Sequence, residues 1–148
     1  MVKYSSNSVY SSVHLAKVSR KTDLVPKLRD LHEALAELTQ DPNERPKDLN
    51  TIAAQLVSDR ILRHADREVR LLASCCVCDI LRVYAPEAPY NEVELVKIFE
   101  VISAMLRLLS SYDVASSLGS LALYILSSLS AVNSCVVLIY LVRNNVPS

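Results

Sequence analysis

The side chains best suited to chemistry in this chain are its four cysteines, Cys75, Cys76, Cys78 and Cys135. Cys75 and Cys78 form a Cys-x-x-Cys pair, a spacing that redox enzymes and zinc sites use. A redox pair opens a helix that follows a strand, whereas the sequence around Cys75 predicts a helix with no strand before it. A zinc site needs a second matched pair of ligands, which His32 and His64 do not form. We therefore expect reduced thiols packed within a helix, as in a cytosolic or nuclear protein.

The histidines also lack a recognisable catalytic arrangement. His14, His32 and His64 lie in separate segments, without an acid and a nucleophile at a spacing that would build a triad on one helix. We expect His32 and His64 to be surface residues. The only glycine, Gly119, makes glycine-rich phosphate loops nearly impossible. The sequence therefore predicts no catalytic residue, no metal ligand and no bound cofactor.

The charge pattern argues against direct nucleic-acid recognition. Lysine plus arginine and aspartate plus glutamate number 16 each, so the formal net charge is zero and no overall basic field exists. Tryptophan is absent and tyrosine is scattered, so no aromatic platform for stacked bases is predicted. Residues 1–21 are rich in serine, carry basic residues without acids, and lack the apolar core of a signal peptide. We interpret them as a flexible, solvated arm.

The cysteines and histidines must be positioned by helices, because apolar residues recur at helical spacing along the chain and glycine is nearly absent. We expect Asp23 to cap the first helix, with Pro26 in its first turn. An apolar stripe on this helix consists of Leu24, Leu28, Leu31, Leu35 and Leu38. Further helices are predicted over about residues 48–64, 67–84 and 91–109, with a fifth starting near residue 113 and a sixth over about 134–143.

The third predicted helix, residues 67–84, contains the clustered thiols. Asp66 is placed to cap it. Its core face consists of Val69, Leu72, Ala73, Cys76, Val77, Ile80 and Tyr84. Arg70, Ser74 and Arg82 are expected to point away from that face.

An elbow with two prolines follows this helix and consists of Ala85, Pro86, Glu87, Ala88, Pro89 and Tyr90. The prolines cannot continue a helix and bias the preceding residues to an extended shape. Asn91 followed by Glu94 predicts a capping box that starts the next helix. The elbow could bind a partner, with Tyr90 as a rigid anchor and Glu87 as an orienting charge. Alternatively it only turns the chain, with Tyr90 packed inward.

No charged residue occurs between residues 114 and 142, which is long enough for a membrane-spanning helix. A C-terminal membrane anchor around residues 121–142 is therefore an alternative. Ser127, Ser128, Ser130, Asn133 and Ser134 would each need a hydrogen-bond partner within the lipid, which favours two helices that break near Asn133 instead.

The segment from Val69 to Tyr90 resembles the N-terminal region of the precocious-dissociation-of-sisters family of cohesin cofactors, the fifth such protein. The shared features are an arginine-led helix with paired cysteines, an aspartate–isoleucine step and the Ala-Pro-acid-Ala-Pro-Tyr elbow. Looser similarity extends over about residues 24–141. The turn at residues 64–73 also looks like that of a HEAT repeat, with an antiparallel helix on either side.

The resemblance implies an all-α fold of HEAT-like antiparallel helix pairs, with an arm over residues 1–21 and a helical domain over 22–148. The chain would hold the first few helices of a much longer α-solenoid. It implies a nuclear, chromatin-associated, non-enzymatic scaffold that regulates cohesin in sister chromatid cohesion. The implied partners are cohesin subunits, the wings-apart-like release factor and the cohesin acetyltransferase, with the elbow residues as the binding site. Any contact with chromatin would then run through cohesin.

Overall fold

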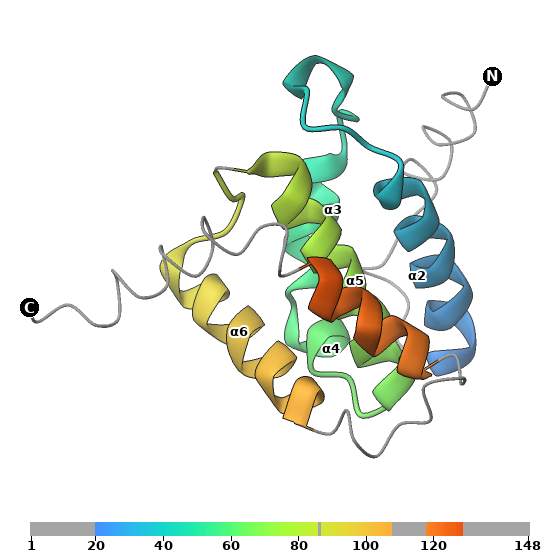
Figure 1. The fold of residues 1–148 in the computed structure, drawn as a ribbon. Coiled ribbons are helices and arrows are strands. Elements are labelled where there is room, and N and C mark those ends of the chain that lie inside the picture. The colour runs from blue at the N-terminus through green and yellow to red at the C-terminus, as the bar shows by residue number, and fades with distance from the viewer. Residues whose placement is uncertain (1–19, 86, 108–117, 129–148) are drawn as a thin grey trace, which may run out of the picture.

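The computed structural model describes residues 20–85, 87–107 and 118–128, and these residues are arranged as packed helices without a strand (Figure 1). The elements are α2 (Lys21–Ala36), the short 3-10 helix η2 (Pro42–Glu44), α3 (Leu49–Leu56), α4 (Asp59–Leu62), α5 (Arg67–Tyr84) and α6 (Glu92–Arg107). Residues 118–128 are also helical. The predicted all-α fold is confirmed.

Several predictions concern residues outside these ranges. They include residues 1–19 of the arm predicted over residues 1–21, the histidine at position 14, the helix start near residue 113, the helix over 134–143, the cysteine at position 135, and Pro86. Of the uncharged segment, residues 118–128 are described. Within the described part of the chain, no helix combines the length and apolar character needed to cross a membrane.

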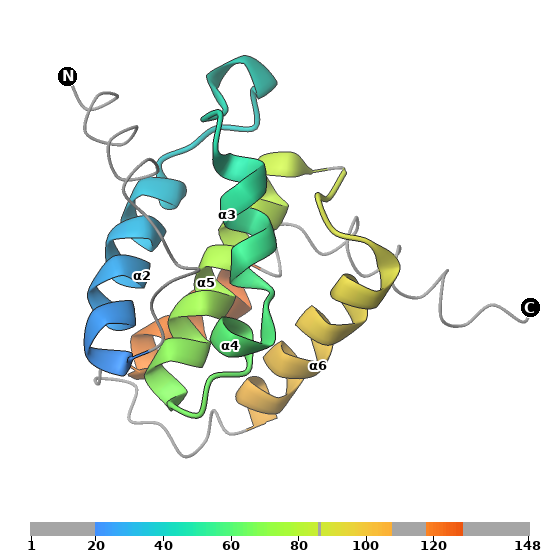
Figure 2. The same ribbon diagram turned by 180° about the vertical axis from the view of Figure 1, so that it is seen from behind.

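The helices form two sets that run in opposite directions. α2 runs parallel to α5, because Lys21 pairs with Asp66 where both helices begin and Arg82 contacts Leu35 where both end. The segment 118–128 has the same direction, since its successive turns meet successive turns of α5. α3 with α4, and then α6, run the opposite way on the other side of α5 (Figures 1 and 2). The expected antiparallel pairing across residues 64–66 is therefore confirmed.

α5 is the centre of this arrangement, and its side chains from residue 71 to residue 81 are all buried. A helix surrounded on every side has no solvent face, whatever its pattern of polar residues. The expectation that Ser74 points away from the core is therefore wrong, because its side chain is fully buried and its hydroxyl lies 3.9 Å from the sulfur of Met105. Arg70 and Arg82 are half-buried.

α2 has the predicted leucine stripe but a different start. The four leucines within the helix are fully buried, and Leu38, two residues beyond its end, packs against the core. The helix begins at Lys21 after Arg20, so Asp23 does not cap it. Asp23 instead lies in the first turn, where its charge interacts favourably with the unpaired N–H groups, and Pro26 lies one turn further in.

The helix predicted over residues 48–64 is divided into α3 and α4. Between them the Ser58 hydroxyl donates a 2.8 Å hydrogen bond to the carbonyl of Gln55, and Ser58 itself is extended. Serine side chains that bond nearby backbone groups compete with the helix in this way. The break lets both Ile61 and Leu62 enter the core beside α5.

Candidate functional site

The elbow begins at Ala85 with the backbone shape expected of a residue that precedes proline. Ala85 has an extended backbone (φ −54°, ψ 143°), as expected for a residue before proline. The Glu87 N–H donates to the Tyr84 carbonyl at 2.9 Å, which closes the turn. Glu87 is exposed, while Ala88 and Pro89 are half-buried. Glu87 is thus the described elbow residue that is most open to solvent.

Tyr90 does not present its ring to solvent. It is 7% exposed, and its hydroxyl donates a 3.1 Å hydrogen bond to the Ala53 carbonyl in α3. A tyrosine ring can be buried when its hydroxyl finds such an acceptor. Burial, with a smaller contribution from the charge of Glu94, raises the pKa of Tyr90 well above its usual value. Of the two alternatives for Tyr90, the structure has the one in which the ring packs inward, and the ring ties the elbow to α3.

The predicted capping box at the start of α6 is confirmed. The Asn91 side chain accepts a 2.8 Å hydrogen bond from the Glu94 N–H, and the Glu94 carboxylate accepts one of 2.9 Å from the Asn91 N–H. This reciprocal pair satisfies two N–H groups that no helical carbonyl could reach. The elbow is therefore held at its far end as well.

The connector between α2 and α3, residues 37–48, lies against the near end of the elbow. The Arg82 guanidinium donates to the Leu38 carbonyl at 2.7 Å and to the Leu35 carbonyl at 2.9 Å, so it caps the carboxyl end of α2. The Gln40 amide donates in turn to the Arg82 carbonyl at 3.1 Å. Arg45 lies 4.0 Å above the centre of the Tyr84 ring. The last turn of α5, from which the elbow starts, is thus fastened to the connector.

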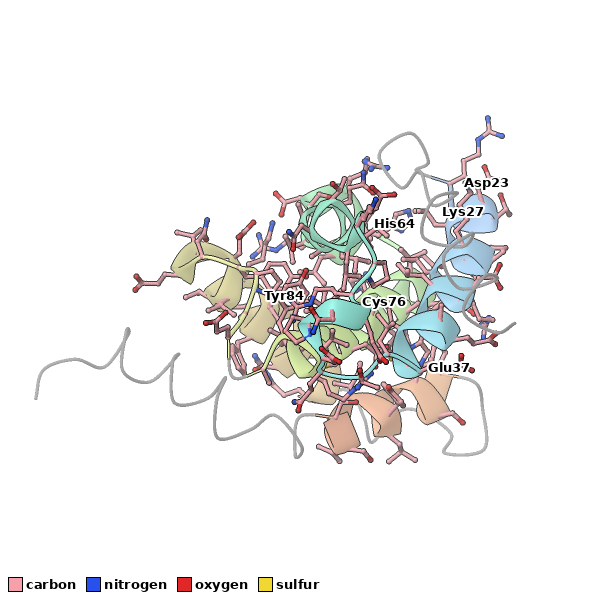
Figure 3. The ribbon with its side chains drawn as sticks, turned by 90° about the horizontal axis from the view of Figure 1, so that it is seen from above. Asp23, Lys27, Glu37, His64, Cys76 and Tyr84 are labelled. Atoms are coloured by element: carbon pink, nitrogen blue, oxygen red, sulfur yellow. The ribbon has the colours of Figure 1, made fainter. Side chains whose placement is uncertain are left out.

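The three described thiols lie in the core, as predicted. Cys75, Cys76 and Cys78 are fully buried and form no disulfide. In Figure 3, Cys76 lies among the helices, whereas Asp23 and Lys27 project from α2. Burial raises the pKa of each thiol, so all three stay protonated and are poor nucleophiles and metal ligands. Within the described residues, no group of three histidine, cysteine or acidic side chains could hold a metal ion.

The structure reveals a buried polar cluster that sequence reasoning missed, which we call the polar clasp: His32, Asp79 and Tyr124. Asp79 is fully buried and accepts hydrogen bonds from His32 Nδ1 at 2.8 Å and from the Tyr124 hydroxyl. The two rings meet edge to face with centres 4.5 Å apart. His32 is therefore not the surface residue that we expected. An aspartate inside an apolar helical run was the available signal, because such a group needs partners.

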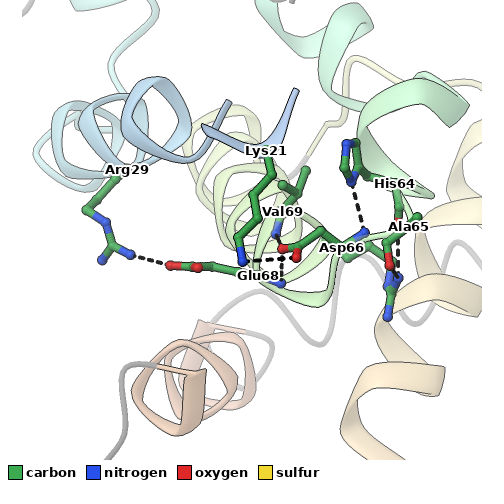
Figure 4. A network of polar contacts seen from close by, with 8 residues as sticks. Lys21, Arg29, His64, Ala65, Asp66, Glu68 and Val69 are labelled. Atoms are coloured by element: carbon green, nitrogen blue, oxygen red, sulfur yellow. Dashed lines mark hydrogen bonds and ion pairs between the residues drawn. The ribbon is translucent and has the colours of Figure 1, made fainter. Parts of the chain in front are cut away.

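A second set of polar contacts joins α2 to the beginning of α5 (Figure 4). Asp66 caps α5 as predicted, accepting from the N–H groups of Glu68 and Val69 at 2.9 and 3.2 Å. Lys21 lies 3.1 Å from Asp66, and Arg29 lies 2.7 Å from Glu68. Burial raises the pKa of Asp66, but the contacts to Lys21, Val69 and Glu68 outweigh it and leave the pKa lowered.

His64 also takes part in this network. Its Nδ1 accepts a 2.9 Å hydrogen bond from the Asp66 N–H, and its carbonyl accepts one of 2.8 Å from Arg70. His64 is half-buried, so the expectation of a simple surface residue is only partly right. Its role is to shape the tight link between α4 and α5.

Comparison with known proteins decides the family of the chain. The family model described as sister chromatid cohesion protein PDS5 matches residues 22–146, which include every described helix except the first residue of α2. The chain belongs to the PDS5 family. The resemblance seen in the elbow and the thiol helix is thereby confirmed.

Individual PDS5 proteins are similar to parts of this chain. The pds5 protein of Schizosaccharomyces pombe is 36% identical over 119 residues, which is 80% of this chain and 10% of that protein. The PDS5 protein of Saccharomyces cerevisiae is 38% identical over 68% of this chain and 8% of its own length. PDS5 homolog B-A of Xenopus laevis is 40% identical over 59% of this chain and 6% of its own length. The matched region is thus at most about a tenth of these relatives.

A solved structure has the same fold. A chain from the structure of the Pds5–Scc1 complex superposes with a TM-score of 0.70 and 32% identity, over 78% of this chain and 16% of that chain. This likeness, together with the two directions of helices around α5, establishes the HEAT-like architecture of a PDS5 solenoid.

Proposed function

We propose that this chain is a non-catalytic, protein-binding scaffold of the cohesin machinery that acts in sister chromatid cohesion in the nucleus. The observation that carries the proposal is the PDS5 family match across residues 22–146. The relatives are named as sister chromatid cohesion proteins, and the solved neighbour was found in a complex with Scc1. Cohesin subunits are the first partners to test, followed by the wings-apart-like release factor and the cohesin acetyltransferase. Contact with chromatin would be indirect, through these proteins.

The elbow, residues 85–90, is the proposed binding site. Some of its residues hold its shape, and others contact the partner. Tyr90 and the capping box hold its far end, and the connector holds its near end. The exposed Glu87 supplies the orienting charge, and Ala88 and Pro89 supply apolar contact. Because the bend is already held in place, the loss of conformational entropy when a partner binds the elbow would be small.

A capture experiment with purified, tagged chain tests this proposal. We expect Glu87→Lys to lower the recovery of cohesin subunits from nuclear extract, measured by immunoblot for Scc1, by about tenfold, because the reversed charge repels a partner surface that complements Glu87. Glu33→Lys is the matched control, because Glu33 is an exposed acid on α2. Unchanged recovery with Glu87→Lys, at equal helix content, would exclude the elbow as the site. If the unaltered chain recovers no cohesin protein at all, the scaffold proposal fails for this region.

A further inference from the structure

Thr39 differs from the other hydroxyl side chains in the described parts of the molecule. Five other serines and threonines are exposed there, and all lie on helices: Thr22, Thr51, Ser103, Ser120 and Ser127. Thr39 is exposed and lies in the irregular connector. A kinase must bring an acceptor hydroxyl to the γ-phosphate of ATP, and a hydrogen-bonded helix resists the rearrangement that this needs. Among these residues the connector therefore offers the most accessible acceptor.

The Thr39 hydroxyl links the beginning of the connector to η2 through two hydrogen bonds. It donates a 2.7 Å hydrogen bond to Glu44 Oε2 and accepts one of 3.2 Å from the Asp41 N–H. Asp41 also caps η2 by accepting from the Asn43 N–H at 2.9 Å. These contacts hold η2 as a small loop whose shape depends on a neutral hydroxyl beside a carboxylate.

The residues flanking this loop touch the turn of α5 that leads into the elbow. Leu38, just before Thr39, accepts from the Arg82 side chain, and Gln40, just after it, donates to the Arg82 carbonyl. Arg45, just after η2, lies over the Tyr84 ring. Figure 1 shows the connector at the end of the molecule where α5 finishes. A change in the loop would therefore reach the base of the elbow.

We propose that Thr39 is the phosphorylation site of a serine/threonine protein kinase, and that the phosphate opens the connector beside the elbow. In the reaction, Thr39 Oγ1 attacks the γ-phosphorus of ATP, and the new bond is Oγ1–P. The bond from that phosphorus to the bridging oxygen breaks, ADP leaves, and the hydroxyl proton passes to the catalytic base of the kinase.

The direction of the structural change follows from the contacts. The phosphate has no proton for Glu44 and adds a charge of about −1.5 to −2, so an attractive contact becomes a repulsive one. Asp41, which lies in the same loop and donates its N–H to the Thr39 hydroxyl, carries a second carboxylate that adds to the repulsion. Because Arg45 directly follows η2, opening of the loop moves Arg45 away from the Tyr84 ring. The effect on partner binding rests on the function proposed for the elbow, but the opening of the connector does not.

Hydrogen exchange on the full chain carrying phosphothreonine at position 39 tests the opening. We expect amides of residues 43–45 to exchange about tenfold faster than in the unmodified chain, as for loss of one charge-assisted hydrogen bond. The amides of Glu68 and Val69, held by Asp66, should not change and serve as the internal reference. Thr39→Val, which cannot be phosphorylated, should raise exchange less because it adds no charge. Equal exchange in the modified and unmodified chains would overturn the proposal.

A charge substitution and an occupancy measurement complete the test. Glu44→Lys in the phosphorylated chain should return exchange of residues 43–45 toward the unmodified level, because the repulsion becomes attraction. In dividing cells that express the tagged chain, mass spectrometry should find phosphate on Thr39. Phosphate confined to the helical serines and threonines would also overturn the proposal. If the connector opens but Glu87→Lys leaves cohesin recovery unchanged, the elbow function fails while Thr39 stands as the modification site.

Discussion

α5 is joined to α2 at two places, its beginning and the buried Asp79, by similar chemistry in different surroundings. At its beginning, Asp66 and Glu68 face Lys21 and Arg29, whose side chains are 53% and 42% exposed. Further along, Asp79 faces His32 with 0% and 15% exposure. Water can replace the partner of an exposed charge but cannot reach Asp79. The exposed end therefore contributes little free energy, while the buried clasp strongly disfavours any arrangement that leaves Asp79 unpaired.

Removing the buried carboxylate should have the largest effect. Asp79→Ala leaves His32 Nδ1 and the Tyr124 hydroxyl without their acceptor, and we expect the free energy of unfolding to fall by about 3–5 kcal/mol. Asp79→Asn keeps one acceptor oxygen and should lose less. Urea denaturation followed by circular dichroism measures both. A loss no greater than that of the exposed pair described below would remove the contrast between the two places.

Alkaline pH should lower the free energy of unfolding through the buried thiols of α5. Thiol pKa values are near 9.0 when exposed, and burial raises those of Cys75, Cys76 and Cys78. Above about pH 9 only the unfolded chain loses these protons, so stability is complete below that pH and falls as pH rises. Each thiol should contribute a loss of about 1.4 kcal/mol per pH unit. Urea denaturation at pH 8 and pH 10 measures it, and Cys76→Ala should lessen the dependence by the share of one thiol.

The cap at the exposed end should matter less. Asp66→Ala leaves two N–H groups unpaired at the start of α5, and we expect a loss of about 1 kcal/mol in urea denaturation. Asp66→Asn retains the cap and loses only the charge contact with Lys21, so it should be nearly neutral. Because the pKa of Asp66 is lowered from 3.8, its charge stabilises the fold above that pH and the contribution is lost as pH falls further. An effect of Asp66→Asn equal to that of Asp66→Ala would assign the loss to Lys21.

The smallest effect should come from the exposed ion pair. A double-mutant cycle with Arg29→Met and Glu68→Gln should give a coupling of about 0.2–1 kcal/mol, decreasing as salt is added. The same cycle on His32→Gln and Asp79→Asn should give a larger coupling that responds weakly to salt. If salt weakens both couplings equally, then water and ions reach the clasp, and its burial is not the cause of its strength.

Much of the fold could be predicted because its signals are local. The leucine stripe of α2, the extent of α5, the Asp66 cap and the Asn91–Glu94 capping box each depend on residues within a few positions of one another. The elbow followed from its two prolines. The break at Ser58 was missed because apolar periodicity continues through it, and nothing nearby indicates that two helices pack better against α5 than one.

Local sequence patterns predicted the position of the candidate site but not its contacts with other helices. The six-residue elbow and its exposed Glu87 could be named from sequence. The sequence left the position of Tyr90 open, because its inward packing depends on the carbonyl of Ala53 in another helix. The same applies to Thr39, whose relation to the elbow arises from contacts between the connector and the last turn of α5.

The sequence by itself determined the helical class, most helix positions, the elbow and the PDS5 resemblance, because periodicity, capping and proline restrict the backbone over short distances. Only the tertiary structure decided which polar side chains are buried and with whom they pair. His32 and Asp79 are 47 residues apart, and their contact exists because α2, α5 and residues 118–128 run in the same direction side by side. Burial depends on how many helices surround a position, and a pattern within one helix does not contain that information.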